Sequence, residues 1–276
     1  GDAGVNAAHM LQWRGIAESR MHGAYLLRDG MSAYDLYTML SRNRQTPVRL
    51  TFNNLRTTDQ LAARVASVLD INADEFRSAA DSILADIPSP ERIGHFMPDT
   101  YEFYWTVSPS RLVNTLTGYY DRFWNETRRN KAKALGLTPA QITTIASIAE
   151  EETNDPAERG TVGRLYINRL HRGMPLQADP TVKFAVGDFS LRRITNAHLS
   201  VKSPYNTYLN PGLPPGPIRM PSGATIDAIL NAPANNYLYM CAKEDFSGKH
   251  NFTADYSTHL ANARRYHQAL NSRNIR

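Results

Sequence analysis

Three consecutive glutamates, Glu150, Glu151 and Glu152, close a segment whose apolar residues recur at helical spacing. The apolar residues of that segment form one stripe on a helix: Ile142, Ile145, Ala146, Ile148 and Ala149. Because successive side chains of a helix are rotated by about 100°, Glu151 and Glu150 lie about 150° and about 110° from the centre of the stripe. Glu152 lies only about 50° from it. Glu152 is therefore the carboxylate that this helix turns toward its buried side.

A carboxyl group that lies against apolar neighbours loses hydration, which raises its pKa and suits it to donate a proton near neutral pH. Glu152 is thus a candidate general acid. The spacing alone leaves a structural role equally open, since a run of glutamates is also typical of a solvated helix end. Asn154-Asp155-Pro156 has the features of a helix start, so Glu152 lies at a junction between two helices, where a cleft forms easily. We assign Glu158, three residues after Asp155, to the cap of the second helix.

The elements that must position Glu152 alternate along the chain. In the first 86 residues we expect short strands at Gly23–Leu27 and Thr46–Phe52, with helices that start at Ser32, Thr57 and Asn72. Further elements are expected in the rest of the chain: a strand at Tyr101–Trp105, one long helix from Ser108 to Gly136, a helix that starts at Thr138, a helix at Ile226–Asn231, a strand at Tyr237–Cys241 and a terminal helix from Ser257. Between residues 173 and 223 proline and glycine are dense, which predicts long ordered loops.

Composition excludes several classes of protein. Of the 276 residues, 42% are hydrophobic and 21% charged, so the chain can build a packed core and is not disordered. The single cysteine, Cys241, rules out a disulfide framework and zinc sites built on paired thiolates. The eight histidines include no His-Glu-x-x-His motif, and we expect neither a metal nor a cofactor. The net charge of +5 suits nucleic acid, an anionic membrane surface or an acidic polymer such as cell-wall glycan. We do not expect nucleic-acid binding, because the densest basic cluster lies at a predicted helix end.

An ordered series of motifs between about residues 145 and 267 resembles the endolytic murein transglycosylases of the MltG/YceG-like family. The motifs that carry the resemblance are Ile145–Thr153, Glu158-Arg159, Ile167–Leu170, Gly173–Val182, Tyr205–Tyr208, Gly212–Ile218, Tyr237–Tyr239 and His250–Phe252. Upstream, Gly94–Tyr101 resembles the segment before the catalytic domain of that family, and the region around Gly23–Tyr25 resembles its LysM-like subdomain more weakly. This resemblance implies an α+β fold with three parts: a LysM-like subdomain at 1–53, a helical connecting region at 54–136 and a catalytic domain at 137–276.

The resemblance also implies a bacterial enzyme that cuts glycan strands within nascent peptidoglycan, with Glu152 as its catalytic residue. One glutamate would act first as acid and then as base, and the product would carry a 1,6-anhydroMurNAc end. We expect peptidoglycan glycan strands as substrate and cell-wall synthases as partners. We expect the protein at the extracytoplasmic face of the bacterial cell membrane, held there by a single-pass N-terminal anchor that lies outside this chain.

The resemblance and the chemistry together nominate substrate-binding residues: Gln177, Asp179, Tyr205, Asn206, Tyr208, Pro214, Pro215 and His250. Two other functions remain open. Glycosidases that hydrolyse their substrate use two carboxylates, and Asp179 is the best second acid for such a muramidase. A peptidoglycan-binding scaffold without catalytic activity is favoured by the LysM-like start and the basic charge.

Overall fold

The computed structural model describes residues 2–191 and 193–273 and has a mixed α+β fold in which helices predominate, as expected. The contacts within the chain separate it into two units. The first comprises Gly1–Asn53, Thr57–Ala85 and Asp99–Thr115, and the second comprises Asn54–Arg56, Asp86–Pro98 and Leu116–Arg276. These units are defined by contacts, whereas the boundaries at 53/54 and 136/137 come from the family resemblance and stay predictions.

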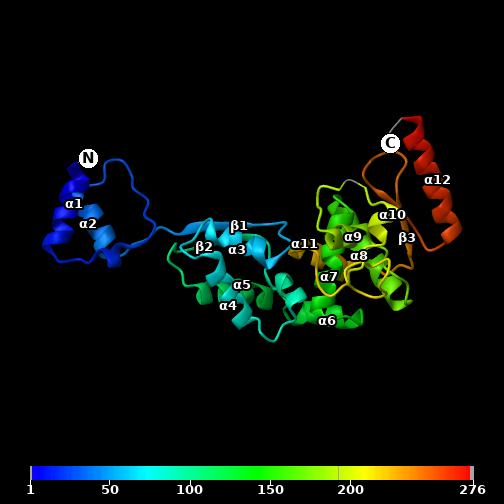
Figure 1. Ribbon diagram of the computed structural model, residues 1–276, viewed down its shortest axis with the longest axis horizontal. Coiled ribbons are helices and arrows are strands. Elements are labelled where there is room, and N and C mark those ends of the chain that lie inside the picture. The colour runs from blue at the N-terminus through cyan, green and yellow to red at the C-terminus, as the bar shows by residue number, and fades with distance from the viewer. Residues whose placement is uncertain (1, 192, 274–276) are drawn as a thin grey trace. The chain divides into compact units, whose positions relative to one another are not determined.

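A two-stranded antiparallel sheet organises part of the first unit (Figure 1). Its strands are β1 (Val48–Phe52) and β2 (Asp99–Phe103), with Leu50 opposite Tyr101. Leu50, Phe52, Tyr101 and Phe103 are buried on one face. The strands predicted at Thr46–Phe52 and Tyr101–Trp105 are present, the second of them two residues earlier than predicted. The helices of this unit are α1 (Asp2–Trp13), α2 (Ala33–Ser41), α3 (Thr58–Ala66) and α4 (Ala73–Ile83), with the 3₁₀ helix η1 (Glu18–Met21).

The predicted caps of three helices in this unit are present. Ser32 and Asn72 each form a capping box with the acidic residue three positions on, and the Thr57 side chain accepts a hydrogen bond from the backbone N–H of Gln60. The strand predicted at Gly23–Leu27 is wrong, because this segment is irregular. The N–H of Thr46 bonds the carbonyl of Ala24, but the N–H of Leu26 bonds the hydroxyl of Thr46 instead of a carbonyl, so no ladder follows.

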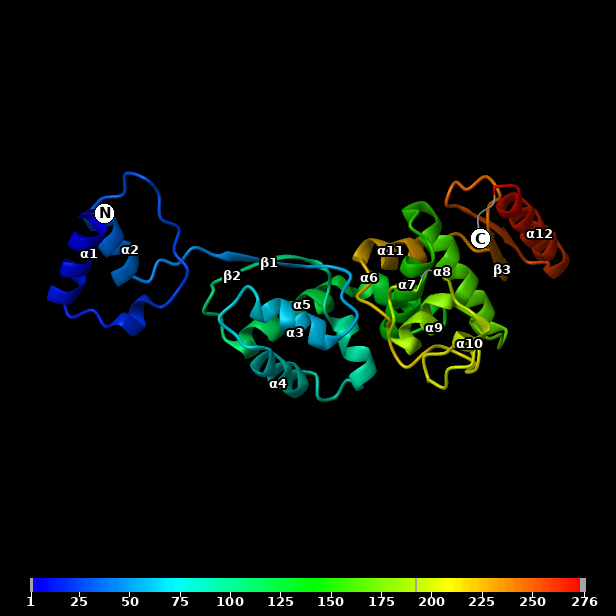
Figure 2. The same ribbon diagram turned by 45° about the horizontal axis from the view of Figure 1, so that its top comes forward.

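The second unit is a helical assembly around a central buried helix (Figure 2). Its elements are η2 (Ser89–His95), α6 (Glu126–Ala134), α7 (Pro139–Glu152), α8 (Pro156–His171), α9 (Asp179–Val186), α10 (Asn196–Leu199), α11 (Gly223–Asn231), α12 (Tyr256–Ser272) and the strands β3 (Tyr239–Ala242) and β4 (His250–Thr253). Every residue of α7 from Ile142 to Glu150 is buried, because α8, α9, α11 and α6 all pack against it. The strands pair antiparallel, and α12 packs beside β3.

The predicted single helix from Ser108 to Gly136 is two helices, α5 (Pro109–Phe123) and α6. The break falls at Trp124 and Asn125. Asn125 caps α6 by accepting a hydrogen bond from the N–H of Arg128, and Trp124 is buried in the core of the second unit. An asparagine that bonds the backbone in this way ends one helix and starts the next, even where the apolar spacing continues.

Helix α7 begins as the sequence predicts. Thr138 and Gln141 form a capping box around Pro139, which occupies the first turn. The predicted helix at the end of the chain, the helix before Asn231 and the strand at Tyr239 are also present. None of the helices in the part of the chain described here combines the length and hydropathy needed to cross a membrane.

Candidate functional site

Glu152 is the last residue of α7 and lines two adjoining cavities of the second unit. We call the smaller of them, with a volume of about 290 Å³, the inner cavity. The larger, with a volume of about 870 Å³, is called the outer cavity. Both contain Glu152 and Asp179 in their walls. Glu152, which the helical spacing predicts to face inward, therefore lines a cavity and is not enclosed in the packed core.

Burial raises the pKa of Glu152 from its usual value of 4.5 to about 7. Loss of hydration is the main cause, and the negative charge of Asp179 adds to it. A hydrogen bond from Tyr166 and the positive charge of Arg169 act in the opposite direction. Glu152 thus exists in both its protonated and ionised forms near neutral pH, as a group that donates and then recovers a proton requires.

Tyr166 of α8 holds the carboxyl group of Glu152. Its hydroxyl donates to Oε1 of Glu152 at 2.7 Å, and the ring is almost fully buried. Burial and the nearby carboxyl raise the pKa of Tyr166 well above 10, so this phenol remains a hydrogen-bond donor at every physiological pH. Oε1 is thereby occupied as an acceptor, and Oε2 is the oxygen left to carry the acidic proton.

The rest of the inner cavity is lined by both polar and apolar side chains. It is lined, besides Glu152, by Leu165, Tyr166, Arg169, Leu176, Gln177, Asp179, Tyr208, Met240 and His259. Gln177 has a positive φ of 50°, a conformation uncommon for residues other than glycine, and its N–H bonds the carbonyl of Thr207. The structure thus brings together Glu152, Gln177, Asp179 and Tyr208 from the predicted site.

Asp179 and Tyr208 form a second hydrogen-bonded pair in this cavity. The Tyr208 hydroxyl donates to Oδ1 of Asp179 at 2.6 Å. Burial and this carboxylate raise the pKa of Tyr208. Asp179 is also the first residue of α9, where a carboxylate is favoured by the helix dipole.

Arg169 and His259 complete the inner cavity. The Arg169 guanidinium donates to the carbonyls of Leu176 and Leu238, so it ties α8 to the chain on both sides of the cavity. The His259 ring stacks on Tyr239 at 5.3 Å, and burial together with the charge of Arg169 lowers its pKa. His259 is therefore neutral near pH 7 and presents no positive charge to the cavity.

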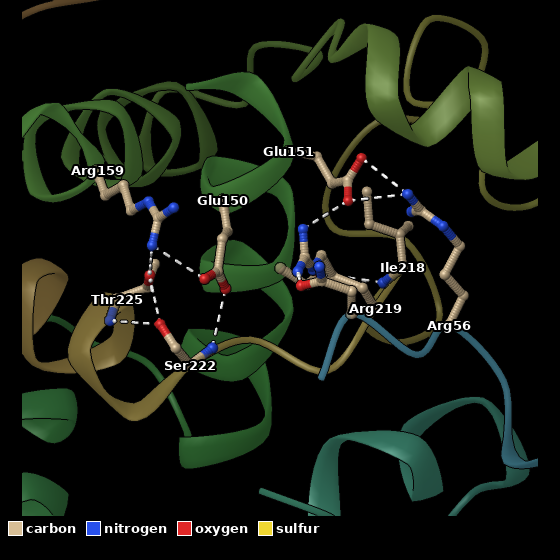
Figure 3. Close-up of polar contacts among 10 residues, drawn as sticks. Arg56, Glu150, Glu151, Arg159, Ile218, Arg219, Ser222 and Thr225 are labelled. Carbon is tan, nitrogen blue, oxygen red and sulfur yellow. Dashed lines mark hydrogen bonds and ion pairs between the residues drawn. The ribbon is translucent and has the colours of Figure 1, made fainter. Parts of the chain in front are cut away.

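The two preceding glutamates have different surroundings, although the sequence alone allows a solvated helix end. Glu150 bonds Arg159 of α8 at 3.0 Å and the N–H of Ser222 at 2.9 Å (Figure 3). Glu151 bonds Arg56 at 3.0 Å and Arg219 at 2.7 Å (Figure 3). Because α7 is surrounded by other elements, both carboxylates are largely buried and both are neutralised by arginine. Glu152 is the member of the run that faces no arginine at bonding distance within the described residues.

Other residues of the predicted site lie elsewhere. The Asn206 amide is buried and donates to the carbonyls of Leu199 and Val201, so its amide hydrogens hold a loop. The Tyr205 ring packs on Phe184 at 4.6 Å. Pro214 and Pro215 line a separate cavity of about 570 Å³. Among the described residues, none of these four lines a cavity that contains Glu152, and their binding roles stay predictions.

Glu158 does not form the predicted cap. Asp155 caps α8 through the N–H of Ala157, whereas the Glu158 carboxylate accepts hydrogen bonds from the backbone and the ring Nδ1 of His250, both at 2.9 Å. Both donors reach the carboxylate from β4, and the Thr153 hydroxyl donates to Oε2 of the same carboxylate at 3.4 Å. His250 accordingly binds Glu158 and is not part of the walls of the two Glu152 cavities in the described chain.

The chain matches the model of the YceG-like family over residues 4–265. It belongs to the YceG-like family. Since that match covers nearly all of the chain, the family assigned from the motifs after residue 145 is confirmed and extends to the first unit.

Curated relatives support the assignment. The chain is 31% identical over 185 residues to the endolytic murein transglycosylase of Bacillus subtilis strain 168, a match that covers 65% of this chain and 49% of the relative. It is 28% identical over 254 residues to the endolytic murein transglycosylase of Streptococcus pneumoniae serotype 2 strain D39, covering 80% of this chain and 46% of the relative. The chain thus spans about half the length of these relatives.

A solved structure shares the fold. The crystal structure of a YceG-like protein from Listeria monocytogenes has a TM-score of 0.68 to this chain, with 24% sequence identity. The similarity covers 92% of this chain and 88% of the other. The mixed α+β fold is therefore the YceG-like fold.

Tyr166, Arg169 and His259 line the inner cavity and were not nominated from the sequence. Tyr166 had a usable signal, because a phenol on the buried side of a helix needs a hydrogen-bond partner. Arg169 lies in a family motif but reads as an ordinary helix-end cation. His259 had no signal, since it reaches the cavity only through the packing of α12 on β3.

Proposed function

We propose that this chain is the catalytic part of an endolytic lytic transglycosylase that cleaves the bond between MurNAc and GlcNAc within nascent peptidoglycan strands. The observation that carries the proposal is the Glu152 carboxyl group, which lies in a cavity wall with a pKa of about 7. The names of the curated relatives supply the substrate class. The glycan lies outside the cell membrane, so the protein acts at the extracytoplasmic face, where an N-terminal anchor and synthase partners remain expectations.

In the first step, Oε2 of Glu152 donates its proton to the oxygen of the glycosidic bond. The bond between that oxygen and C1 of MurNAc breaks, and GlcNAc leaves with a free hydroxyl group. Positive charge develops at C1, and Glu152 is now a carboxylate whose Oε1 still accepts from Tyr166. The Asp179 carboxylate, in the same cavity, helps to stabilise that charge electrostatically.

In the second step, the Glu152 carboxylate accepts the proton of the C6 hydroxyl group of the same MurNAc. The C6 oxygen attacks C1 and forms the 1,6-anhydro ring, and Glu152 regains its starting protonation state. The substrate supplies the nucleophile, so one carboxyl group suffices and no water is consumed. Gln177 and Tyr208 line the same cavity, which supports a role for both in bonding the sugar substituents.

A hydrolytic muramidase is the second candidate, and one observation favours it. Asp179 lines both cavities with Glu152 and could act as the second carboxylate that hydrolysis needs. The bond from Tyr208 to Asp179 engages one oxygen and leaves the other free. The two reactions differ by one water in the product, so mass distinguishes them.

The test is a digest of purified sacculi by the chain and by Glu152→Gln, with the released muropeptides analysed by mass spectrometry. We expect 1,6-anhydroMurNAc ends from the parent chain and a loss of at least 1,000-fold in Glu152→Gln, since the amide cannot donate and recover a proton. Glu126→Gln, an exposed glutamate of α6, serves as the matched control and should retain full activity.

Reducing MurNAc ends, one water heavier, would establish the muramidase instead. Unchanged release by Glu152→Gln would overturn both mechanisms. Sacculus binding without any soluble product, unaffected by the Glu152 substitution, would identify the chain as a scaffold.

A further inference from the structure

Two basic side chains line the outer cavity without an ion pair at bonding distance among the described residues, although the charge of Lys183 also acts on Asp188. Lys183 of α9 is half-buried in the wall and Arg193 is exposed at its edge. The same cavity contains the acidic residues Glu151, Glu152 and Asp179. Acidic and basic groups that share a cavity without pairing leave the basic ones available to a ligand.

Helix α9 leads from the cavity wall beside Glu152 to Lys183. Asp179 and Lys183 are four residues apart on α9, so they share one helix face with a rise of about 6 Å between them. Asp179 also lines the inner cavity beside Glu152. A molecule that extends from Glu152 past Asp179 therefore reaches Lys183 within one helical turn.

The acidic groups of the outer cavity are compensated. Arg56 and Arg219 both bind Glu151, so that group of three carries a net positive charge. Asp179 keeps its negative charge, and Glu152 is largely protonated below neutral pH. With Lys183 and Arg193 added, positive charges outnumber negative ones around the outer cavity, which favours an anionic ligand.

We propose that the outer cavity binds the peptide carried by the reacting MurNAc, with Lys183 and Arg193 as partners for its free carboxylates. The proposal rests on the function proposed above. The peptide is attached through the lactyl group at C3 of the same sugar whose C1 would face Glu152, so it starts beside the residues that both cavities share, Glu152 and Asp179. The outer cavity, with a volume of about 870 Å³, adjoins there and has room for several residues.

The test measures equilibrium binding by the full chain carrying Glu152→Gln, so that cleavage does not interfere. Fluorescently labelled, uncrosslinked glycan strands are compared in three forms: with peptides bearing free carboxylates, with the same peptides amidated, and with the peptides removed by an amidase and the resulting lactyl carboxylates capped as amides. We expect the free-carboxylate strands to bind about 5- to 10-fold more tightly than the other two, as two partly exposed ion pairs provide. Added salt should reduce the difference.

Adding Lys183→Gln and Arg193→Gln should abolish this preference and leave the binding of peptide-free strands unchanged, which also shows that the variant is folded. Arginine keeps the positive charge, so a chain with Lys183→Arg should keep most of the preference that Lys183→Gln loses. Lys202→Gln, an exposed lysine outside both cavities, is the matched control and should bind as the parent does.

Equal binding of the three strands by Glu152→Gln would overturn the peptide subsite, and so would an equal loss on all three in the lysine and arginine variant. If the Glu152→Gln chain prefers strands with free carboxylates but the parent chain releases no product, the subsite is supported and the catalytic proposal is refuted. The two failures are therefore distinguishable.

Discussion

The hydroxyl of Tyr166 lies 2.7 Å from Oε1 of Glu152, across the junction where α7 ends and α8 begins. This bond fixes the carboxyl group and lowers its pKa, whereas burial raises that pKa. The value of about 7 is the balance of these two largest effects, with smaller contributions from the charges of Asp179, Arg169 and Glu151. The proposed chemistry depends on this balance, and it can be shifted in either direction by substitution.

Removing the hydroxyl should shift the pH dependence upward. The first step needs protonated Glu152, so activity is expected to fall as pH rises through about 7. In Tyr166→Phe the bond that lowers the pKa of Glu152 is lost, and the alkaline limb of the profile should move up by about half to one pH unit. Initial rates measured from pH 5 to 9 check this, with Tyr104→Phe, an exposed tyrosine outside both cavities, as the control. A downward shift would contradict the role given to Tyr166.

Replacing Asp179 should shift the profile the other way. The negative charge of Asp179 raises the pKa of Glu152, so Asp179→Asn should move the alkaline limb to lower pH. A transglycosylase should retain activity in this variant and still release anhydro ends, with a rate reduced about 10-fold by the lost charge. Rates and product masses are measured together. Complete loss of activity would instead favour hydrolysis with Asp179 as the second carboxylate.

Much of this fold was predictable from the sequence because residues close to each helix start determine where that helix begins. The caps at Ser32, Asn72 and Thr138 act within four residues and appear as predicted. The strand at Gly23–Leu27 and the continuous helix through Asn125 were wrong. A strand depends on a distant partner, and the asparagine cap overrode an apolar spacing that continued past it.

The candidate site was predictable in its acid but not in most of its walls. The periodicity of one helix placed Glu152 toward the interior, and the structure puts it in a cavity wall. The helical spacing did not predict that Glu150 and Glu151 are also buried. Glu150 pairs with Arg159 of the next helix, and Glu151 pairs with Arg56 and Arg219, which are distant in sequence. Contacts of that kind follow from tertiary packing alone.

The raised pKa of Glu152 should lower the free energy of unfolding as the pH rises. Its pKa is about 7 in the folded chain and near 4.5 when unfolded, so the unfolded chain loses its proton first as pH rises. The free energy of unfolding should fall between pH 4.5 and pH 7 by about 3 kcal/mol from this group and stay level above that. Glu152→Gln lacks this loss, so its stability relative to the parent should increase over the same window. Urea unfolding at pH 4.5, 6 and 8 measures it, and a difference independent of pH would refute the raised pKa.

The packing of α8 on α11 permits no side chain at Gly160. A Cβ there would lie 2.6 Å from the backbone oxygen of Ala228. At Gly163 it would lie 2.4 Å from Cγ1 of Ile229, a side-chain atom. Alanine normally stabilises a helix interior by about 1 kcal/mol, yet both changes should destabilise the chain by about 1–3 kcal/mol.

The two glycines should differ in how they can be rescued. Ile229→Ala should partly relieve Gly163→Ala, because it removes the atoms that clash. It should not relieve Gly160→Ala, because there the obstacle is backbone. Unfolding of the single and double variants gives both coupling energies. Equal rescue of the two would contradict the packing described here.

Direct titration of Glu152 tests the central claim most closely. Carbon-13 NMR of the glutamate side-chain carboxyl groups follows each ionisation, and the resonance missing from Glu152→Gln identifies the group. We predict a midpoint near pH 7 in the parent chain and a higher one in Tyr166→Phe. A midpoint near 4.5, the value of an ordinary glutamate, would contradict the claim that this carboxyl group retains its proton for a sugar oxygen.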